Sequence, residues 1–235
     1  MIRYINLIFF AGMLVMNYLA NALPLNGKTT GQISDNLPNL FTPAGITFSV
    51  WGVIYILLAI FCILQFTAQG RETAISAGWI FALSCVFNAA WIVAWHYEKL
   101  PLSLLLMIGL LISLIYLNLH IKDLSLGWLK AAFGIYLGWI CIASIANVTA
   151  VLVNTGWNGF GIPEVTWTII MIAAGTLIVT LALLRLNNPF IGVVAVWAFL
   201  GIIIKRQADY RLIVVAAAVA ILVVGVFTFK AFIRR

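Results

Sequence analysis

Aromatic and amide side chains recur at helical spacing in three apolar stretches of the sequence, and this pattern could bind a ligand. Residues three or four positions apart return to the same side of a helix, so each set shares one face. The sets are Phe48, Trp51 and Tyr55 in 44–66, Asn88 and Trp91 in 76–96, and Tyr136, Trp139, Ala143 and Asn147 in 130–153. Aromatic faces stack on a flat apolar molecule, and an amide fixes its polar edge. A buried asparagine needs a partner, and that partner is either such a ligand or a neighbouring helix.

Residues for conventional catalysis or metal binding do not occur in a usable pattern. The 6 acidic side chains fall in loops or at predicted helix ends, whereas proton relays and ion-coupled transporters place acids inside the membrane. His96 and His120 stand singly near the predicted interfaces. Either could be a haem ligand, but an interfacial histidine is the favoured interpretation. The 3 cysteines match no metal-ligand spacing and are interpreted as packed apolar side chains. We therefore expect no catalytic residue, no metal site and no required cofactor.

The composition is that of an integral membrane protein. Of the 235 residues, 65% are hydrophobic and 8% are charged, with a mean hydropathy of +1.15, far more apolar than a soluble domain. Apolar runs long enough to cross a bilayer as helices recur along the chain. We predict an all-α membrane protein with about eight transmembrane helices, at residues 2–23, 44–66, 76–96, 100–121, 130–153, 164–185, 189–204 and 211–230. The seventh segment is short and is expected to be tilted or re-entrant.

The basic residues indicate a topology rather than a nucleic-acid partner. The net charge of +7 comes from side chains at predicted helix ends, so no nucleic-acid binding is expected. Eight Lys and Arg residues fall on the side that holds both termini and five on the other, out of 13, which predicts cytoplasmic termini in a bacterial inner membrane. The first segment also resembles a signal peptide, with Ala20-Asn21-Ala22 as a cleavage site. Its length, and Asn6 and Asn17 within it, favour a retained helix.

Proline and glycine residues mark one loop and one close helix contact. The longest polar stretch lies between the first two segments, and we predict a structured or lid-like loop there rather than a helix. Pro43 and Gly45 end this loop, where the second segment begins. Gly134 and Gly138 lie on the face of 130–153 opposite its aromatic set. Their G-x-x-x-G spacing allows another helix to approach closely.

Three motifs in the aromatic stretches resemble signatures of the TspO/MBR family, the tryptophan-rich sensory proteins related to the translocator protein or peripheral benzodiazepine receptor. They are "TPAGITFSVWGVIY", with Pro43, Val50, Trp51 and Tyr55; "FNAAWIVAWHYEKLP", with Asn88 and Trp91; and "IYLGWICIASIAN", with Tyr136, Leu137, Trp139 and Asn147. The motifs come in the family's order and on the matching helices. The resemblance covers about residues 1–153.

The resemblance implies a five-helix transmembrane bundle over 1–153, often dimeric, whose cavity below the first loop binds porphyrins, haem or sterol-like molecules. Residues 154–235 would then form a three-helix transmembrane extension, interpreted as a lipid-facing appendage or an interaction platform. The leading hypothesis is a non-enzymatic membrane receptor, sensor or carrier for a flat hydrophobic ligand, lined by the aromatic and amide residues of the three motifs. The alternatives are a transporter or permease subunit, a porphyrin-degrading enzyme as proposed for relatives, and a purely structural bundle.

Overall fold

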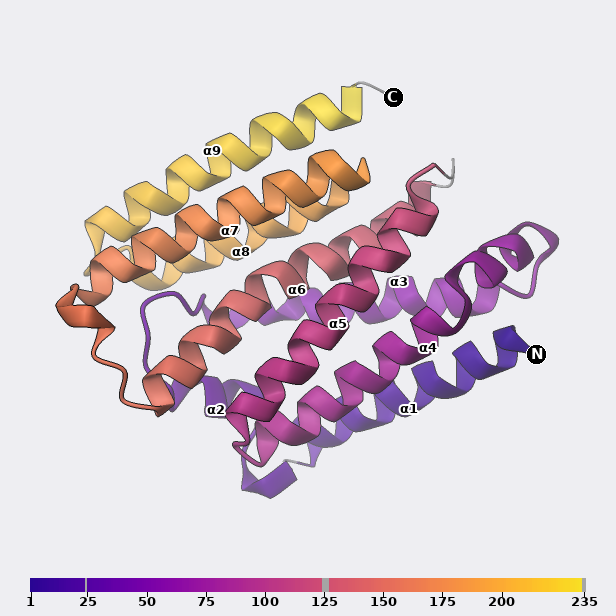
Figure 1. Ribbon diagram of the computed structural model, residues 1–235, viewed down its shortest axis with the longest axis horizontal. Coiled ribbons are helices and arrows are strands. Elements are labelled where there is room, and N and C mark those ends of the chain that lie inside the picture. Colours follow the sequence, from indigo (N-terminus) through magenta and orange to yellow (C-terminus); the bar gives the residue numbers. More distant parts are fainter. Residues whose placement is uncertain (24, 124–126, 234–235) are drawn as a thin grey trace. The chain divides into compact units, whose positions relative to one another are not determined.

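The computed structural model describes residues 1–23, 25–123 and 127–233, and all regular structure in these residues is helical (Figure 1). This confirms the predicted all-α class. The long helices are α1 (Ile2–Ala22), α3 (Val50–Leu64), α4 (Ala68–His96), α5 (Leu100–Ile121), α6 (Gly127–Asn154), α7 (Glu164–Leu186), α8 (Phe190–Arg206) and α9 (Arg211–Ile233). The short ones are η1 (Leu25–Gly27), α2 (Thr30–Asp35), η2 (Gly45–Ser49) and η3 (Gly159–Gly161).

Seven of the described helices are long and apolar enough to cross a membrane. They are α1, the run Gly45–Leu64 formed by η2 and α3, α4 from Ala74 onward, α5, α6, α7 and α9. The remaining predicted segment forms α8, whose 17 residues rise only about 25 Å at about 1.5 Å per residue. This is short of a hydrocarbon core of about 30 Å. The chain is therefore a multi-pass membrane protein in contact with lipid, and the predicted count of eight spans is approximate.

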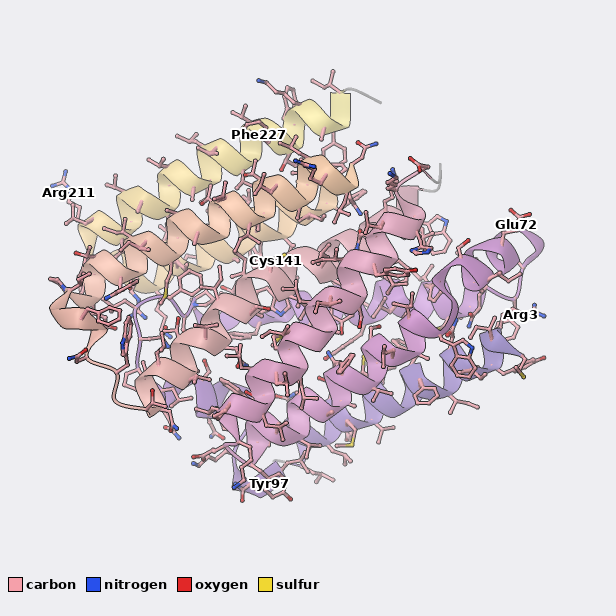
Figure 2. The ribbon with its side chains drawn as sticks, viewed as in Figure 1. Arg3, Glu72, Tyr97, Cys141, Arg211 and Phe227 are labelled. Atoms are coloured by element: carbon pink, nitrogen blue, oxygen red, sulfur yellow. The ribbon has the colours of Figure 1, made fainter. Side chains whose placement is uncertain are left out.

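Charged side chains lie mainly near helix ends, whereas the cysteines lie within helices. Figure 2 shows Arg3 near the start of α1 and Arg211 at the start of α9, whereas Cys141 lies well inside α6. All three cysteines are buried free thiols, in agreement with their interpretation as packing residues. Arg234 and Arg235, which enter the predicted charge count, lie outside the described residues.

The contacts between residues divide the chain into two compact units. Unit 1 consists of Met1–Asn36 and Gly52–Phe133, and unit 2 consists of Leu37–Trp51 and Gly134–Arg235. The division falls inside α6, whereas the sequence predicts a boundary between residues 153 and 154. The division into a five-helix bundle and a three-helix extension at residue 153 stays a prediction.

In unit 1, α4 packs against both α1 and α5. Three phenylalanine rings, Phe61, Phe81 and Phe133, meet edge-to-face with centroids 4.8 to 6.0 Å apart and are fully buried. A polar bond lies beside this apolar packing, because the amide of Asn17 on α1 donates to the Asn88 carbonyl on α4 at 2.7 Å. Such bonds between helices are a common means of association in membrane proteins.

The helix α4 is interrupted at Gly78. This residue has φ 51° and ψ −142°, a conformation that glycine adopts without strain and other residues avoid. The helical turns before Gly78 extend the element to Ala68, ahead of the start at residue 76 expected from the sequence. Glycine at this position therefore separates the beginning of α4 from its membrane-spanning part.

The segment between α1 and η2 is partly helical, which corrects the prediction of a loop. A capping box starts α2: the Thr29 hydroxyl accepts from the Gln32 N–H, and the Gln32 side chain accepts from the Thr29 N–H. Reciprocal bonds of this kind satisfy two N–H groups that a helix start otherwise leaves unpaired. The Thr29-x-x-Gln32 spacing is the sequence signal for this helix start.

In unit 2, α9 packs against both α7 and α8, and α8 also packs against η2. Gly192 of α8 lies directly against the Thr228 side chain of α9, where a Cβ would collide with the hydroxyl. Small residues at such contacts let helix backbones approach closely within a membrane. The three C-terminal helices are thus a packed group that includes η2 from the N-terminal half of the chain.

Candidate ligand-binding site

Four aromatic rings meet in unit 2, where η2 and the start of α3 lie against α6. Trp51 packs edge-to-face on Tyr136, with ring centroids 5.9 Å apart, and on Trp139, at 6.3 Å. Phe48 packs on Trp139 in the same manner at 5.6 Å. Tyr136 and Trp139 are buried, whereas Phe48 and Trp51 are partly exposed. Edge-to-face contacts are favourable for aromatic rings, and these four residues are called the aromatic cluster below.

The centre of the aromatic cluster carries a polar atom without a protein partner. The indole N–H of Trp139 has no hydrogen bond within the described part of the chain, although the residue is only 3% exposed. A buried indole N–H normally finds an acceptor, and leaving one unpaired costs about 1–3 kcal/mol. The buried hydroxyl of Thr47, next to Phe48 in the chain, likewise has no partner among the described residues. A ligand oxygen would satisfy the Trp139 donor.

Residues 37–49, called the docked segment below, run from the loop into η2 and are bonded to α8. Arg206 donates from its guanidinium to the main-chain carbonyls of Asn39 (2.6 Å) and Leu40 (3.1 Å). The Asn39 side chain accepts from the main-chain N–H of Thr42 at 2.8 Å, which shapes the turn that Arg206 binds. A charged donor bound to two carbonyls is among the stronger hydrogen-bond arrangements in proteins.

The docked segment meets α8 again one and two turns closer to the helix start. The N–H of Ala44 donates to the Gly201 carbonyl at 3.0 Å, and the indole of Trp197 donates to the Thr47 carbonyl at 3.0 Å. A Cβ on Gly201 would collide with the Thr47 hydroxyl and would lie 2.9 Å from the Pro43 side chain. Glycine at residue 201 therefore permits the close approach. Pro43, predicted at the end of a lid-like loop, is packed against α8.

Residues 154–235 are interpreted from the sequence as a lipid-facing appendage or an interaction platform, and these contacts give α8 a further role within the fold. The helix α8 is largely buried, and it supports the segment that leads into the aromatic cluster. The physical reason is that Trp197 and Arg206 carry donors that need acceptors inside the membrane protein, and the main chain of the docked segment supplies them.

The two glycines of α6, Gly134 and Gly138, also face α8 and the residues just before it. A Cβ on Gly138 would collide with the main-chain oxygen of Ile191 and with the Val194 side chain. A Cβ on Gly134 would meet the side chain of Asn188, whose oxygen accepts from the N–H of Phe190, the first residue of α8, at 3.2 Å. The absence of side chains at both positions thus brings α6 and α8 together.

The other residues predicted for this part of the site lie further along α6 or in η2. Asn147 is buried at 2% exposure, and Ala143 is partly buried. Gly45 is the first residue of η2 and is exposed. Their contribution to a binding site stays a prediction.

Three predicted ligand residues belong to unit 1. Asn88 accepts the hydrogen bond from Asn17, so its amide has the helix–helix role that the sequence left open. Trp91 is 7% exposed and stacks on Trp95, with centroids 5.9 Å apart and an angle of 27°. Tyr55 is partly buried on α3. Ligand contact by these three residues also stays a prediction.

His96 is more deeply integrated in the fold than its interfacial interpretation implied. It is fully buried, with Nε2 2.9 Å from the Thr30 hydroxyl and Nδ1 3.1 Å from the Leu25 carbonyl. Both ring nitrogens are therefore engaged by the segment before α3, which leaves none for axial ligation of a haem iron. The described residues contain no group of three His, Cys, Asp or Glu side chains placed to bind a metal.

Several residues of the site could not be recognised from their type alone. Arg206 counted only as a topology charge, and Trp197, Gly201 and Thr47 were not singled out. Arg206 lies at the end of α8 and off the face that Trp197 and Gly201 share. Those two residues are four positions apart, and this spacing was the available signal. Its meaning depends on main-chain atoms of the docked segment, which no side-chain pattern records.

The fold defines a multi-pass helical membrane protein. A model of the family described as TSPO-like protein matches residues 3–230. The chain belongs to this family. The match continues well past residue 153, where the resemblance was expected to end, and includes α7, α8 and most of α9. Comparisons with curated proteins and with solved structures found no match.

Proposed function

We propose that this protein is a membrane receptor, sensor or carrier that binds a flat hydrophobic molecule, a tetrapyrrole in the first instance, at the aromatic cluster. Trp51, Tyr136 and Trp139 supply aromatic surface. No catalytic residue is required for this function. Membership of the TSPO-like family supports the general class, and the resemblance of the three motifs supports the ligand type.

The observation that carries the proposal is the unpaired indole N–H of Trp139 among four aromatic rings. A site that serves only helix packing has no need of a buried donor, because phenylalanine would fill a similar space without that cost. A tetrapyrrole offers carboxylate oxygens as acceptors and a flat ring system as a stacking surface. The rings of Trp51 and Trp139 lie at 80° to one another, so a flat molecule stacked on one would present its edge to the other.

The test is a titration of the purified protein with protoporphyrin IX, followed by quenching of tryptophan fluorescence. The wild-type protein should show saturable quenching. Trp139→Phe should raise the dissociation constant about 10-fold or more, because a hydrogen bond to a charged acceptor contributes about 1.5–3 kcal/mol. Trp79→Phe is the matched control, since Trp79 is 60% exposed, and its dissociation constant should equal that of the wild type.

Two results would remove the proposal. The first is quenching that rises linearly with porphyrin concentration, which indicates partition into the micelle. The second is an equal dissociation constant for wild type and Trp139→Phe. Cholesterol added as a competitor separates the ligand classes: displacement of the porphyrin indicates that a sterol-like molecule uses the same site.

A further inference from the structure

Unit 2 contains a cavity that the function proposed above does not use. Its volume is about 450 Å³, and it lies among the end of α6, the loop through η3, the start of α7 and residues 38–40 of the docked segment. Cavities of about 300–1,000 Å³ are the size that holds small-molecule ligands. This cavity is called the α6–α7 pocket.

Two tryptophans form an aromatic wall of the α6–α7 pocket. The rings of Trp157 and Trp167 have centroids 4.9 Å apart at an angle of 58°, and both residues are partly buried. The indole N–H of Trp167 donates to the Gly159 carbonyl at 2.8 Å, so Trp167 offers a ligand its π surface rather than its donor. In the sequence, both tryptophans lie near predicted helix ends, a position also typical of the interfacial belt at the membrane surface.

The charge at the α6–α7 pocket is negative. Glu164, the first residue of α7, is the charged side chain among the described residues that line it, and its carboxylate makes no hydrogen bond or ion pair within the described part of the chain. The hydroxyls of Thr149 and Thr168 donate to main-chain carbonyls of their own helices. The pocket therefore offers π surface and one available carboxylate, while these hydroxyl donors are already used.

The Arg206 guanidinium does not form an ion pair with the Glu164 carboxylate within the described part of the chain. Arg206 interacts with Glu164 electrostatically but does not line the pocket. Its N–H groups are bonded to the carbonyls of Asn39 and Leu40.

From this arrangement we propose that the α6–α7 pocket binds an organic cation, a quaternary ammonium group that carries an apolar substituent. Aromatic faces attract such cations. The Glu164 carboxylate adds a charge of opposite sign, and Met171 and Leu152 receive the apolar part. The same chemistry occurs in a free ammonium compound and in the choline headgroup of a lipid. This site is independent of the aromatic cluster, so either proposal can fail without the other.

The experiment is isothermal titration of the full-length protein with benzyltrimethylammonium in an uncharged maltoside detergent. Saturable binding is expected. Glu164→Gln keeps the shape and removes the charge, and it should weaken binding about 10-fold. Trp157→Leu should weaken it about 3- to 10-fold. Glu72→Gln alters another exposed glutamate and should leave the affinity unchanged.

Choline and its uncharged carbon isostere, 3,3-dimethylbutan-1-ol, separate charge from shape. Choline should bind more tightly to the wild type, and the difference should vanish in Glu164→Gln. Competition by added phosphatidylcholine, but not phosphatidylglycerol, would identify the lipid headgroup as the source of the cation. An affinity for benzyltrimethylammonium unchanged in Glu164→Gln would overturn the proposal, as would no saturable binding or equal affinity for choline and its isostere. An unfolding midpoint equal to that of the wild type in sodium dodecyl sulfate titration verifies that Glu164→Gln is folded.

Discussion

Two tryptophan N–H groups in unit 2 provide a direct test of the geometry around the docked segment. The indole of Trp197 donates to the Thr47 carbonyl at 3.0 Å, whereas the indole of Trp139 has no acceptor within the described part of the chain. Replacing either tryptophan by benzothienylalanine, in which sulfur takes the place of N–H, removes the donor and keeps the bicyclic shape. The two replacements are expected to change the free energy of unfolding in opposite directions.

The magnitudes follow from the environment of each donor. At Trp197, the replacement removes the hydrogen bond and leaves the Thr47 carbonyl without its donor, which should destabilise the protein by about 0.5–1.5 kcal/mol. At Trp139, removal of an unpaired buried donor should stabilise the ligand-free protein, by as much as about 1–3 kcal/mol. The two variants should thus differ by about 2 kcal/mol or more in unfolding by sodium dodecyl sulfate titration in mixed micelles.

Bound ligand should affect the two variants differently. With saturating protoporphyrin IX, the Trp139 variant should gain less stability than the wild type, because it cannot donate to the ligand and binds it more weakly. The gain of the Trp197 variant should match that of the wild type. Equal destabilisation of the ligand-free protein by both replacements would show that Trp139 has an acceptor in the fold, and the argument for the site would then be wrong.

Three further substitutions test how the helices are held. Gly201→Ala places a methyl group on the docked segment and should destabilise the protein by about 1–3 kcal/mol, whereas Gly225→Ala, which meets open space, should leave the melting temperature nearly unchanged. Arg206→Lys removes the planar fork that reaches two carbonyls, so hydrogen exchange of amides in the docked segment should accelerate. Asn17→Leu removes the bond to Asn88 and should cost about 0.5–2 kcal/mol in sodium dodecyl sulfate titration, and no loss would show that this bond is dispensable.

The membrane helices were predictable because their signal is strong and local. Long apolar runs identified every long helix, and the ends of α5 agree with the predicted segment 100–121. The buried face of α4 followed from helical spacing as well: Phe81, Ser84 and Asn88 are fully buried, and Trp91 and Trp95 nearly so.

The supporting contacts could not be predicted, because they depend on main-chain atoms and on loop conformation. The Arg206 side chain appears in the sequence as one more basic residue at a helix end, where the positive-inside rule already explains it. Trp157 and Trp167 likewise match the interfacial belt as well as they match a pocket. Only the conformation of the intervening loop, with Phe160 at φ 54°, brings the two rings together with Glu164.

The bonds that hold the docked segment have a consequence for how this protein could diversify. Arg206, Gly201 and Trp197 all bind main-chain N–H or C=O groups of the docked segment, and nearly every residue type presents the same groups. Position is therefore set largely by these main-chain bonds, so exposed positions of the docked segment such as Ile46 are free to vary, whereas Phe41 and Thr47 are buried. A new ligand preference could arise by substitution in this segment without a compensating change in the helix that supports it.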